Sequence, residues 1–255
     1  MKSLHLGLVA ATLLCVPYVA SANPINVVSY QTLSQTVTFS DVAGGSGNGG
    51  VGTNYDGILT SGGQQFAEHF AGQTLGALVI VPDTFDTLSG TPTSPLALQA
   101  GLAGNNLAVF DIGGSNGNAL AGIGTQGFNF DGVGNGSIAM LFAAPQFQLG
   151  FEIIGTDLNL AGAPSGNATV NFFRANGTLI DTVVLANLTD GFYGFSREGG
   201  LNDIAGFSVN NTDINGIAYD NFTFGTSSTV PEPSTFLLVG MAGLVLARRV
   251  KRSAK

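Results

Sequence analysis

The sequence is poor in positive charge and lacks side chains that several classes of protein require. Its 255 residues include 8 Lys and Arg against 16 Asp and Glu, and no Trp. Six of the basic residues lie near the two ends, so residues 23–230 keep only Arg174 and Arg197 against 15 acidic residues, a net charge of −13. A segment with this charge does not attract phosphate groups, so we expect no nucleic-acid partner.

Thiol chemistry is also missing from most of the chain. The one cysteine, Cys15, lies in the N-terminal apolar segment. The rest of the sequence therefore has no Cys for a disulfide, a zinc cluster or a nucleophile. Apolar residues nevertheless make up 44% of the chain, which excludes wholesale disorder and allows one large domain.

The N-terminus has the order of features that is typical of a secretory signal. Lys2 is followed by an apolar segment that runs to Val19, and small residues stand at Ala20 and Ala22. A signal peptidase reads small residues at these two positions, so the pattern predicts a signal peptide over residues 1–22 and cleavage after Ala22.

The C-terminus combines a proline-flanked motif, an apolar segment and a basic cluster. Two prolines make the motif extended and accessible, and a basic cluster stays on the cytoplasmic side of a membrane. The apolar segment has 14 residues, so as a helix it spans about 21 Å of the roughly 30 Å hydrocarbon layer. The motif residues are Val230, Pro231, Glu232, Pro233 and Ser234, and the basic cluster is Arg248, Arg249, Lys251 and Arg252.

This tail, residues 230–255, resembles the PEP-CTERM sorting signal of Gram-negative bacteria that make exopolysaccharide. The resemblance implies that an exosortase recognises Pro231-Glu232-Pro233 and processes the chain nearby. It also implies a precursor held transiently in the inner membrane and a product at the cell surface or in the extracellular matrix. An ordinary tail anchor and a buried core helix are the alternatives.

Between the ends, residues 23–225 alternate apolar and polar side chains, which predicts short strands. Strands are expected at Val37–Phe39 and Phe147–Ile153, and Asn176-Gly177 predicts a hairpin turn between two apolar segments. Gln64–Phe70 is the one segment whose periodicity suggests a helix. The pattern favours one all-β domain, an antiparallel β-sandwich, followed by a linker at residues 226–229.

The order of these segments resembles the jelly-roll-like bodies of many PEP-CTERM proteins. The similar features are a strand ending in Phe-Ser-Asp, a Phe-Phe-Arg-x-Asn-Gly hairpin and a closing Tyr-Asp-Asn-Phe-Thr-Phe. These are packing and turn residues, so the resemblance implies a fold and not an activity. The Gly- and Asn-rich stretches at residues 41–57 and 113–136 are expected to be long surface loops.

Two aspartates are candidate metal ligands. In a strand with period two, Asp220 lies on the same side as Phe222 and Phe224, and Asp41 on the same side as Val37 and Phe39. An inward carboxylate is costly unless a cation or several donors meet it, so a structural Ca²⁺ at Asp220 and Asp41 is one hypothesis. The alternative is that each Asp lies at a strand end and faces solvent or caps backbone N–H groups. We expect no other cofactor.

We expect a non-enzymatic, exported surface or matrix protein whose partners are a signal peptidase, an exosortase and extracellular polysaccharide. A carbohydrate-binding module is one alternative, which predicts exposed aromatics, with Tyr55, Tyr193 and Tyr219 as the candidates. A secreted hydrolase is another, which predicts a cleft that holds His69 or a carboxylate pair about 5 to 10 Å apart.

Overall fold

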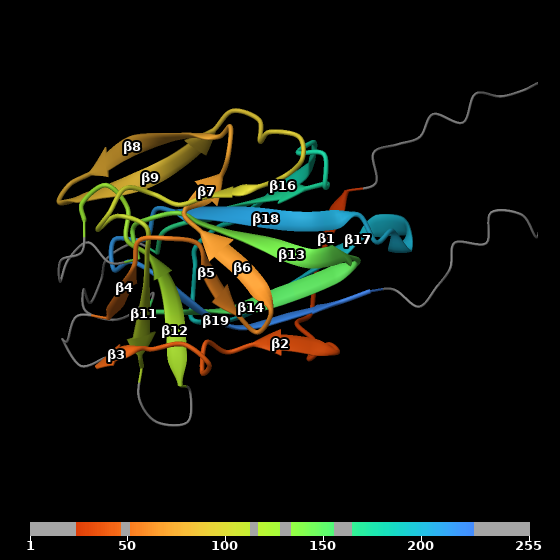
Figure 1. Ribbon diagram of the computed structural model, residues 1–255, viewed down its shortest axis with the longest axis horizontal. Helices are drawn as coiled ribbons and strands as arrows, with labels where there is room; N and C mark the ends of the chain where they lie inside the picture. Colours follow the sequence, from red (N-terminus) through yellow and green to blue (C-terminus); the bar gives the residue numbers. More distant parts are fainter. Residues whose placement is uncertain (1–23, 47–51, 113–116, 128–133, 156–164, 227–255) are drawn as a thin grey trace, which may run out of the picture.

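A computed structural model describes residues 24–46, 52–112, 117–127, 134–155 and 165–226 (Figure 1). The described residues form strands and one short 3₁₀ turn, η1 (Glu198–Gly200). Among them, no helix has the length and apolar character needed to cross a membrane. The predicted signal peptide and the predicted sorting tail both lie outside these ranges.

The larger layer is a nine-stranded sheet, antiparallel except for one parallel pair, β11 with β3. Strands β14 and β19 lie at its centre, and β2 and β4 pair with β19 and β11 outside the main order. In spatial order the strands are β1 (Ile25–Val28), β17 (Gly191–Arg197), β14 (Gln148–Ile154), β19 (Ala218–Gly225), β12 (Asn118–Gly122), β11 (Leu107–Asp111) and β3 (Gly45–Ser46), with β2 (Gln35–Val37) and β4 (Thr53–Tyr55).

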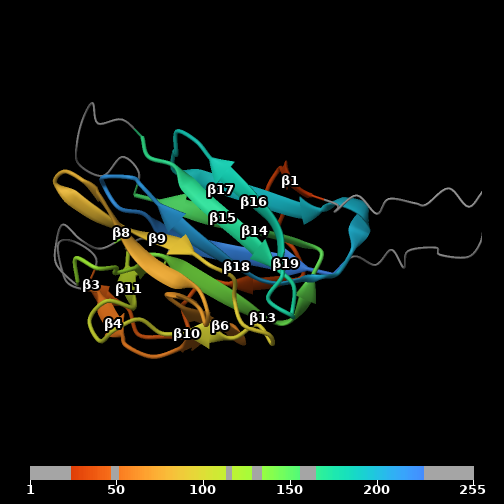
Figure 2. The same ribbon diagram turned by 90° about the horizontal axis from the view of Figure 1, so that it is seen from above.

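The second layer is an antiparallel six-stranded sheet, whose strands run side by side in Figure 2. Its strands in spatial order are β16 (Leu179–Leu185), β15 (Ala168–Phe173), β18 (Ile204–Asn211), β13 (Ile138–Gln146), β6 (Gln64–Ala67) and β5 (Leu59–Ser61). Two small antiparallel sheets complete the described part: β7 (His69–Phe70) with β10 (Leu98–Gln99), and β8 (Thr74–Ile80) with β9 (Asp83–Ser89).

Aromatic side chains fill the space between the two large sheets. Phe151 and Phe222 from the nine-stranded sheet contact Phe207 from the six-stranded sheet, with ring centroids 5.7 and 6.2 Å from Phe207. All three are buried. The shared core makes the fold a β-sandwich, which confirms the predicted all-β, mainly antiparallel class. The jelly-roll-like connectivity stays a prediction.

Several local predictions are confirmed. The Asn176-Gly177 turn joins β15 and β16, which pair antiparallel, and Gly177 has a φ of 78°, as such a turn requires. The alternation at Phe147–Ile153 forms β14. The predicted strand at Val37–Phe39 is shorter than expected, because β2 ends at Val37 and Phe39 adopts a left-handed φ of 53° that directs its ring into the core.

The helix hinted at over Gln64–Phe70 is wrong. This segment forms β6 and β7, which pair with β13 and β10. In β6 the residues at even positions, Gln64 and Phe66, are buried and Gln65 is exposed, which is the period of a strand. The side chain of Gln64 accepts a hydrogen bond from the backbone N–H of Ala143 in the neighbouring strand.

The predicted loop at residues 113–136 is also wrong in part, because it contains β12. This strand is internal to the nine-stranded sheet, and Ala119, Leu120 and Ala121 are buried. Glycine makes this packing possible: a Cβ on Gly122 would lie 2.4 Å from the carbonyl oxygen of Gly136. Here glycine indicates close backbone approach and not a flexible loop.

The first and last described residues of the chain lie at the same edge of the sandwich. The backbone N–H of Glu198 donates to Pro24, and that of Arg197 donates to Phe147. The N–H of Phe147 in turn donates to Gly225, the last residue of β19. Residues 24 and 225 are thus joined by successive backbone hydrogen bonds across β17 and β14, as the right-hand side of Figure 1 also shows.

Candidate functional site

A β-bulge interrupts the pairing of the two central strands, β14 and β19. Gly150 pairs with Thr223 and Glu152 with Asp220, so β19 has one residue more than β14 between these pairs. Asn221 adopts a φ of 47° at this point. A bulge bends its strand and redirects side chains, and a non-glycine residue at positive φ is strained.

The bulge moves Asp220 to the outer face of the sheet. Tyr219 and Phe222 both pack in the core, so Asp220, adjacent to Tyr219, points the opposite way. The period-two prediction that Asp220 shares a face with Phe222 and Phe224 is therefore wrong, because the additional residue at Asn221 shifts the alternation. Glu152 lies between two core residues, Phe151 and Ile153, and faces outward beside Asp220.

Asp220 is nevertheless buried, and its carboxylate has no hydrogen-bond partner. Its exposed fraction is 0%, and neither Oδ1 nor Oδ2 meets a donor in hydrogen-bonding geometry. Burial raises the pKa of Asp220 to about 7. The backbone N–H of Asn221, which is near the carboxylate but not in hydrogen-bonding geometry with it, opposes this shift, and the charge of Glu152 adds to it. No basic side chain in residues 23–230 is left to neutralise it, because Arg174 and Arg197 both pair with Asp203.

Polar and aromatic groups surround the two carboxylates. The side-chain amide of Asn221 donates to Glu152 Oε2 at 2.6 Å, and the hydroxyl of Tyr30 donates to the Asn221 carbonyl at 2.9 Å. The ring of Tyr30 packs 4.7 Å from that of Phe192, which pairs with Glu152 in register and is 53% exposed. We call Tyr30, Glu152, Phe192, Asp220 and Asn221 the bulge site.

Asp41, the other predicted metal ligand, has different neighbours. Its carboxylate accepts hydrogen bonds from the Ser61 hydroxyl and from the Gly62 backbone N–H. These bonds lower its pKa, the Ser61 bond most. Asp41 thus caps the turn between β5 and β6, which agrees with the alternative that it binds backbone N–H groups, and the structure gives no contact between it and Asp220.

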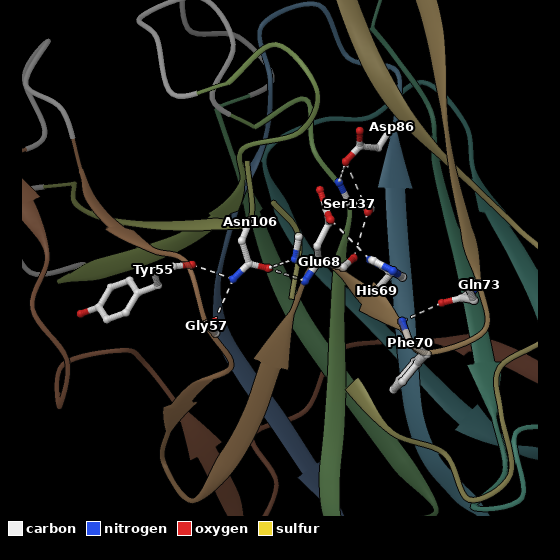
Figure 3. Close-up of polar contacts among 10 residues, drawn as sticks. Tyr55, Gly57, Glu68, His69, Phe70, Gln73, Asp86, Asn106 and Ser137 are labelled. Carbon is white, nitrogen blue, oxygen red and sulfur yellow. Dashed lines mark hydrogen bonds and ion pairs between the residues drawn. The ribbon is translucent and has the colours of Figure 1, made fainter. Parts of the chain in front are cut away.

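A second group of buried acids lies where β6, β7, β9 and β13 meet (Figure 3). Asp86 Oδ2 accepts a hydrogen bond from the Ser137 backbone N–H at 3.0 Å, and the Ser137 hydroxyl donates to the Glu68 carbonyl at 2.9 Å. Burial raises the pKa of Asp86 to about 6, and the charge of Glu68 contributes. We call Glu68, His69, Asp86, Asn106 and Ser137 the Glu68 cluster.

Asn106 holds this cluster to the rest of the fold. Its side-chain oxygen accepts from the N–H groups of Glu68 and Gly101, and its amide donates to the carbonyls of Tyr55 and Gly57. Figure 3 shows the amide at the centre of these contacts. Asn106 has an exposed fraction of 0% and forms hydrogen bonds with four backbone groups at once. These bonds indicate a structural role.

His69, which the hydrolase alternative places in a cleft, is 5% exposed, and its Nδ1 lies 3.4 Å from Glu68 Oε2. The hydroxyl of Ser137 donates to a carbonyl and not to His69. A cavity of about 130 Å³ lies elsewhere, lined by Gln73, Leu88, Gly90, Thr91, Pro92, Asn171, Phe173 and Leu179. Neither His69 nor a carboxylate lines this cavity.

The three tyrosines predicted for sugar binding have other roles in the structure. Tyr219 is fully buried in the core. Tyr193 is half-buried, and its hydroxyl exchanges two hydrogen bonds with the backbone of Thr189. The hydroxyl of Tyr55 donates to the Ala43 carbonyl. The sequence reasoning missed Tyr30 and Phe192, although the exposed position of Phe192 follows from its alternation with the core residue Phe195.

Within the described residues, no group of three or more His, Cys, Asp or Glu side chains is arranged to hold a metal ion. The predicted cleavage residues Ala20 and Ala22, the motif at 230–234 and the basic cluster at 248–252 lie outside the described residues. Their positions in space are therefore not part of the site geometry.

Comparison with known proteins identifies one sequence motif in this chain. A family model described as the PEP-CTERM protein-sorting motif matches residues 229–252. This range contains the predicted motif, the apolar segment and the basic cluster. No curated protein and no solved structure matches the chain.

Proposed function

We propose that this chain, a PEP-CTERM domain-containing protein exported through a membrane-anchored precursor, acts without catalysis at the cell surface or in the exopolysaccharide matrix. The match of the sorting motif to residues 229–252, directly after the last strand of the sandwich, carries this proposal. An exosortase recognises Pro231-Glu232-Pro233 and releases the sandwich from the membrane.

The position of the two described ends supports this arrangement. Residues 24 and 225 lie at one edge of the sandwich, so the predicted signal and the sorting tail both attach there. A body tethered at that edge projects away from the membrane. Because each strand residue advances about 3.3 Å, the bulge site lies roughly 15 Å from this edge and stays accessible in a tethered precursor.

The charge of the body supports an extracellular, non-enzymatic role. Both Arg residues of residues 23–230 are bound to Asp203, and carboxylates far outnumber basic side chains in this segment. An acidic body of this kind resists self-association and attracts divalent cations that bridge anionic polysaccharide. In the Glu68 cluster, His69 is buried and Ser137 bonds to a carbonyl, an arrangement that favours structure over catalysis.

Replacement of the motif glutamate tests the sorting proposal. We expect Glu232→Ala, and separately Arg248→Ala with Arg249→Ala, to leave the full-length precursor in the inner membrane after a pulse of labelling, whereas the wild-type chain is converted to a shorter product. Ser227→Ala in the expected linker is the matched control and should mature normally. Normal maturation of both motif variants would contradict the proposal.

Carbohydrate binding is a second candidate, which the exposed aromatic pair favours. Phe192 is 53% exposed, packs on Tyr30 and neighbours the carboxylate of Glu152. An aromatic face beside hydrogen-bond acceptors suits a sugar ring, which has apolar C–H and polar O–H groups. On a glycan array, we expect Phe192→Ser to lose binding that Val184→Ser, an equally exposed position on β16, retains. Equal binding by the two variants would exclude this surface.

A further inference from the structure

We propose that the bulge site binds a divalent cation, Ca²⁺ in particular, through the carboxylates of Asp220 and Glu152. The inference goes beyond the sorting proposal and does not depend on it, because it concerns described residues of the sandwich alone. It also differs from the sequence-based hypothesis, which paired Asp220 with Asp41.

The main argument is that Asp220 is buried without compensation. A carboxylate taken out of water requires hydrogen-bond donors or a cation. Asp220 has an exposed fraction of 0%, and both of its oxygens lack a hydrogen-bond partner. Its cross-strand neighbour, Glu152, adds a second negative charge instead of a donor. A cation from solution supplies what the side chains of this site do not.

The polar side chains nearest to Asp220 carry oxygen. Glu152 pairs with it from β14, and Tyr30, in the segment before β2, donates to the carbonyl of the adjacent Asn221. Burial, then the charges of Glu152 and Asp220, raise the pKa of Tyr30, so its hydroxyl lies within electrostatic range of both carboxylates. On the other side, β12 offers Ala119 and Ala121, which carry no charge.

This ligand chemistry selects a hard cation. The site offers two carboxylates, while His69, the one His of residues 23–230, belongs to the Glu68 cluster. Oxygen ligands favour Ca²⁺ and Mg²⁺ over transition metals. Ca²⁺ accepts irregular geometry and completes its shell with water, whereas Mg²⁺ demands a near-ideal octahedron. With few protein ligands, we expect a Kd on the order of 10⁻⁴ to 10⁻³ M, the range of extracellular modules.

Terbium luminescence tests the proposal on the full chain, solubilised in a neutral detergent. Tb³⁺ replaces Ca²⁺ at oxygen sites, and the chain has no Trp, so a nearby tyrosine must sensitise its emission. Tyr30 is placed to do so. We expect saturable emission that Ca²⁺ displaces, with the Tb³⁺ Kd raised at least tenfold by Asp220→Asn and by Glu152→Gln.

Asp41→Asn is the matched control, because it removes a carboxylate that Ser61 and Gly62 already bind. It should leave the titration unchanged. If Asp220→Asn fails to fold, as judged by circular dichroism, the more exposed Glu152→Gln decides the question. The proposal is overturned if the folded Asp220→Asn or Glu152→Gln variant binds Tb³⁺ with the wild-type Kd. It is also overturned if Asp41→Asn raises the Tb³⁺ Kd as much as these variants do.

Discussion

The bulge site and the Glu68 cluster each contain two acidic side chains, yet the fold treats them differently. In the Glu68 cluster, each carboxylate has one unpaired oxygen, Glu68 Oε2 and Asp86 Oδ1, but the N–H of Ser137 donates to Asp86 Oδ2 and His69 lies beside Glu68. At the bulge site, neither oxygen of Asp220 has a hydrogen-bond partner. The comparison teaches that burial alone does not identify a binding site. The proposed cation site rests instead on a buried carboxylate whose two oxygens both lack a hydrogen-bond partner.

The largest expected effect is the loss of Asn106, the anchor of the Glu68 cluster. Asn106→Ala leaves four backbone groups unpaired, of which the N–H of Glu68 is buried, so we expect the free energy of unfolding to fall by about 2 to 4 kcal/mol. Denaturant unfolding measures it. Asn54→Ala, at an exposed position on the adjacent β4, should change stability by less than about 0.5 kcal/mol. Equal effects would show that the cluster is not structural.

The next effect is the pH dependence that Asp86 imposes. Its pKa is about 6 in the folded state against an ordinary 3.8, so between these pH values the folded state holds the proton and the unfolded state does not. The stability from this group is therefore present at pH 4 and lost as pH rises to 6. We expect the wild type to lose about 2 kcal/mol more than Asp86→Asn over this interval.

Urea titrations at pH 4, 5, 6 and 7 measure this difference. The readout is the slope of stability against pH, because an Asn side chain changes the absolute stability at every pH. Asp41→Asn serves as the control, since the pKa of Asp41 is shifted in the opposite direction. Parallel curves for the wild type and Asp86→Asn would show that Asp86 is not a strained buried acid.

A smaller effect distinguishes the bulge site. At 10 mM Ca²⁺ and a Kd near 10⁻³ M, linkage gives about 1 to 2 kcal/mol of stabilisation at neutral pH. We expect this increment in the wild type and in Asp86→Asn, and its loss in Asp220→Asn. Thermal unfolding with Ca²⁺ and with chelator measures it. An increment that disappears in Asp86→Asn would assign the cation to the Glu68 cluster instead.

The smallest effect concerns the support of the bulge. Tyr30→Phe removes the hydrogen bond to the Asn221 carbonyl and keeps the ring contact with Phe192, so we expect a loss of about 0.5 to 1.5 kcal/mol. Tyr55→Phe, which removes a hydrogen bond to Ala43, is the control for a bulge-independent tyrosine. Only Tyr30→Phe should also weaken Ca²⁺ binding in the same unfolding assay.

Local alternation predicted some of the strands in the two large sheets. The β15–β16 hairpin and β14 follow from Asn-Gly turn chemistry and from apolar residues at every second position. The strand β12 was not predicted, because it lies within the Gly-rich stretch 113–136, whose composition is typical of a loop; the contact of Gly136 with Gly122 explains the glycines. That contact joins residues 14 positions apart through backbone packing, which no local pattern contains.

The candidate site was predictable only in part. Asp220 was singled out for its position among Phe222 and Phe224, but the bulge at Asn221 reverses the face on which it lies. The one additional residue in β19 therefore places the carboxylate of Asp220 beside Glu152 and not beside Asp41. Sequence periodicity assumes regular pairing, so a bulge, which depends on both strands, is invisible to it.

Anomalous diffraction from crystals in which Tb³⁺ replaces Ca²⁺ at neutral pH tests the central claim most directly. The account predicts a peak between Asp220 and Glu152, about 2.3 to 2.6 Å from the carboxylate oxygens, and none between Glu68 and Asp86. A structure with no ion at the bulge, or with its peak in the Glu68 cluster, would contradict it.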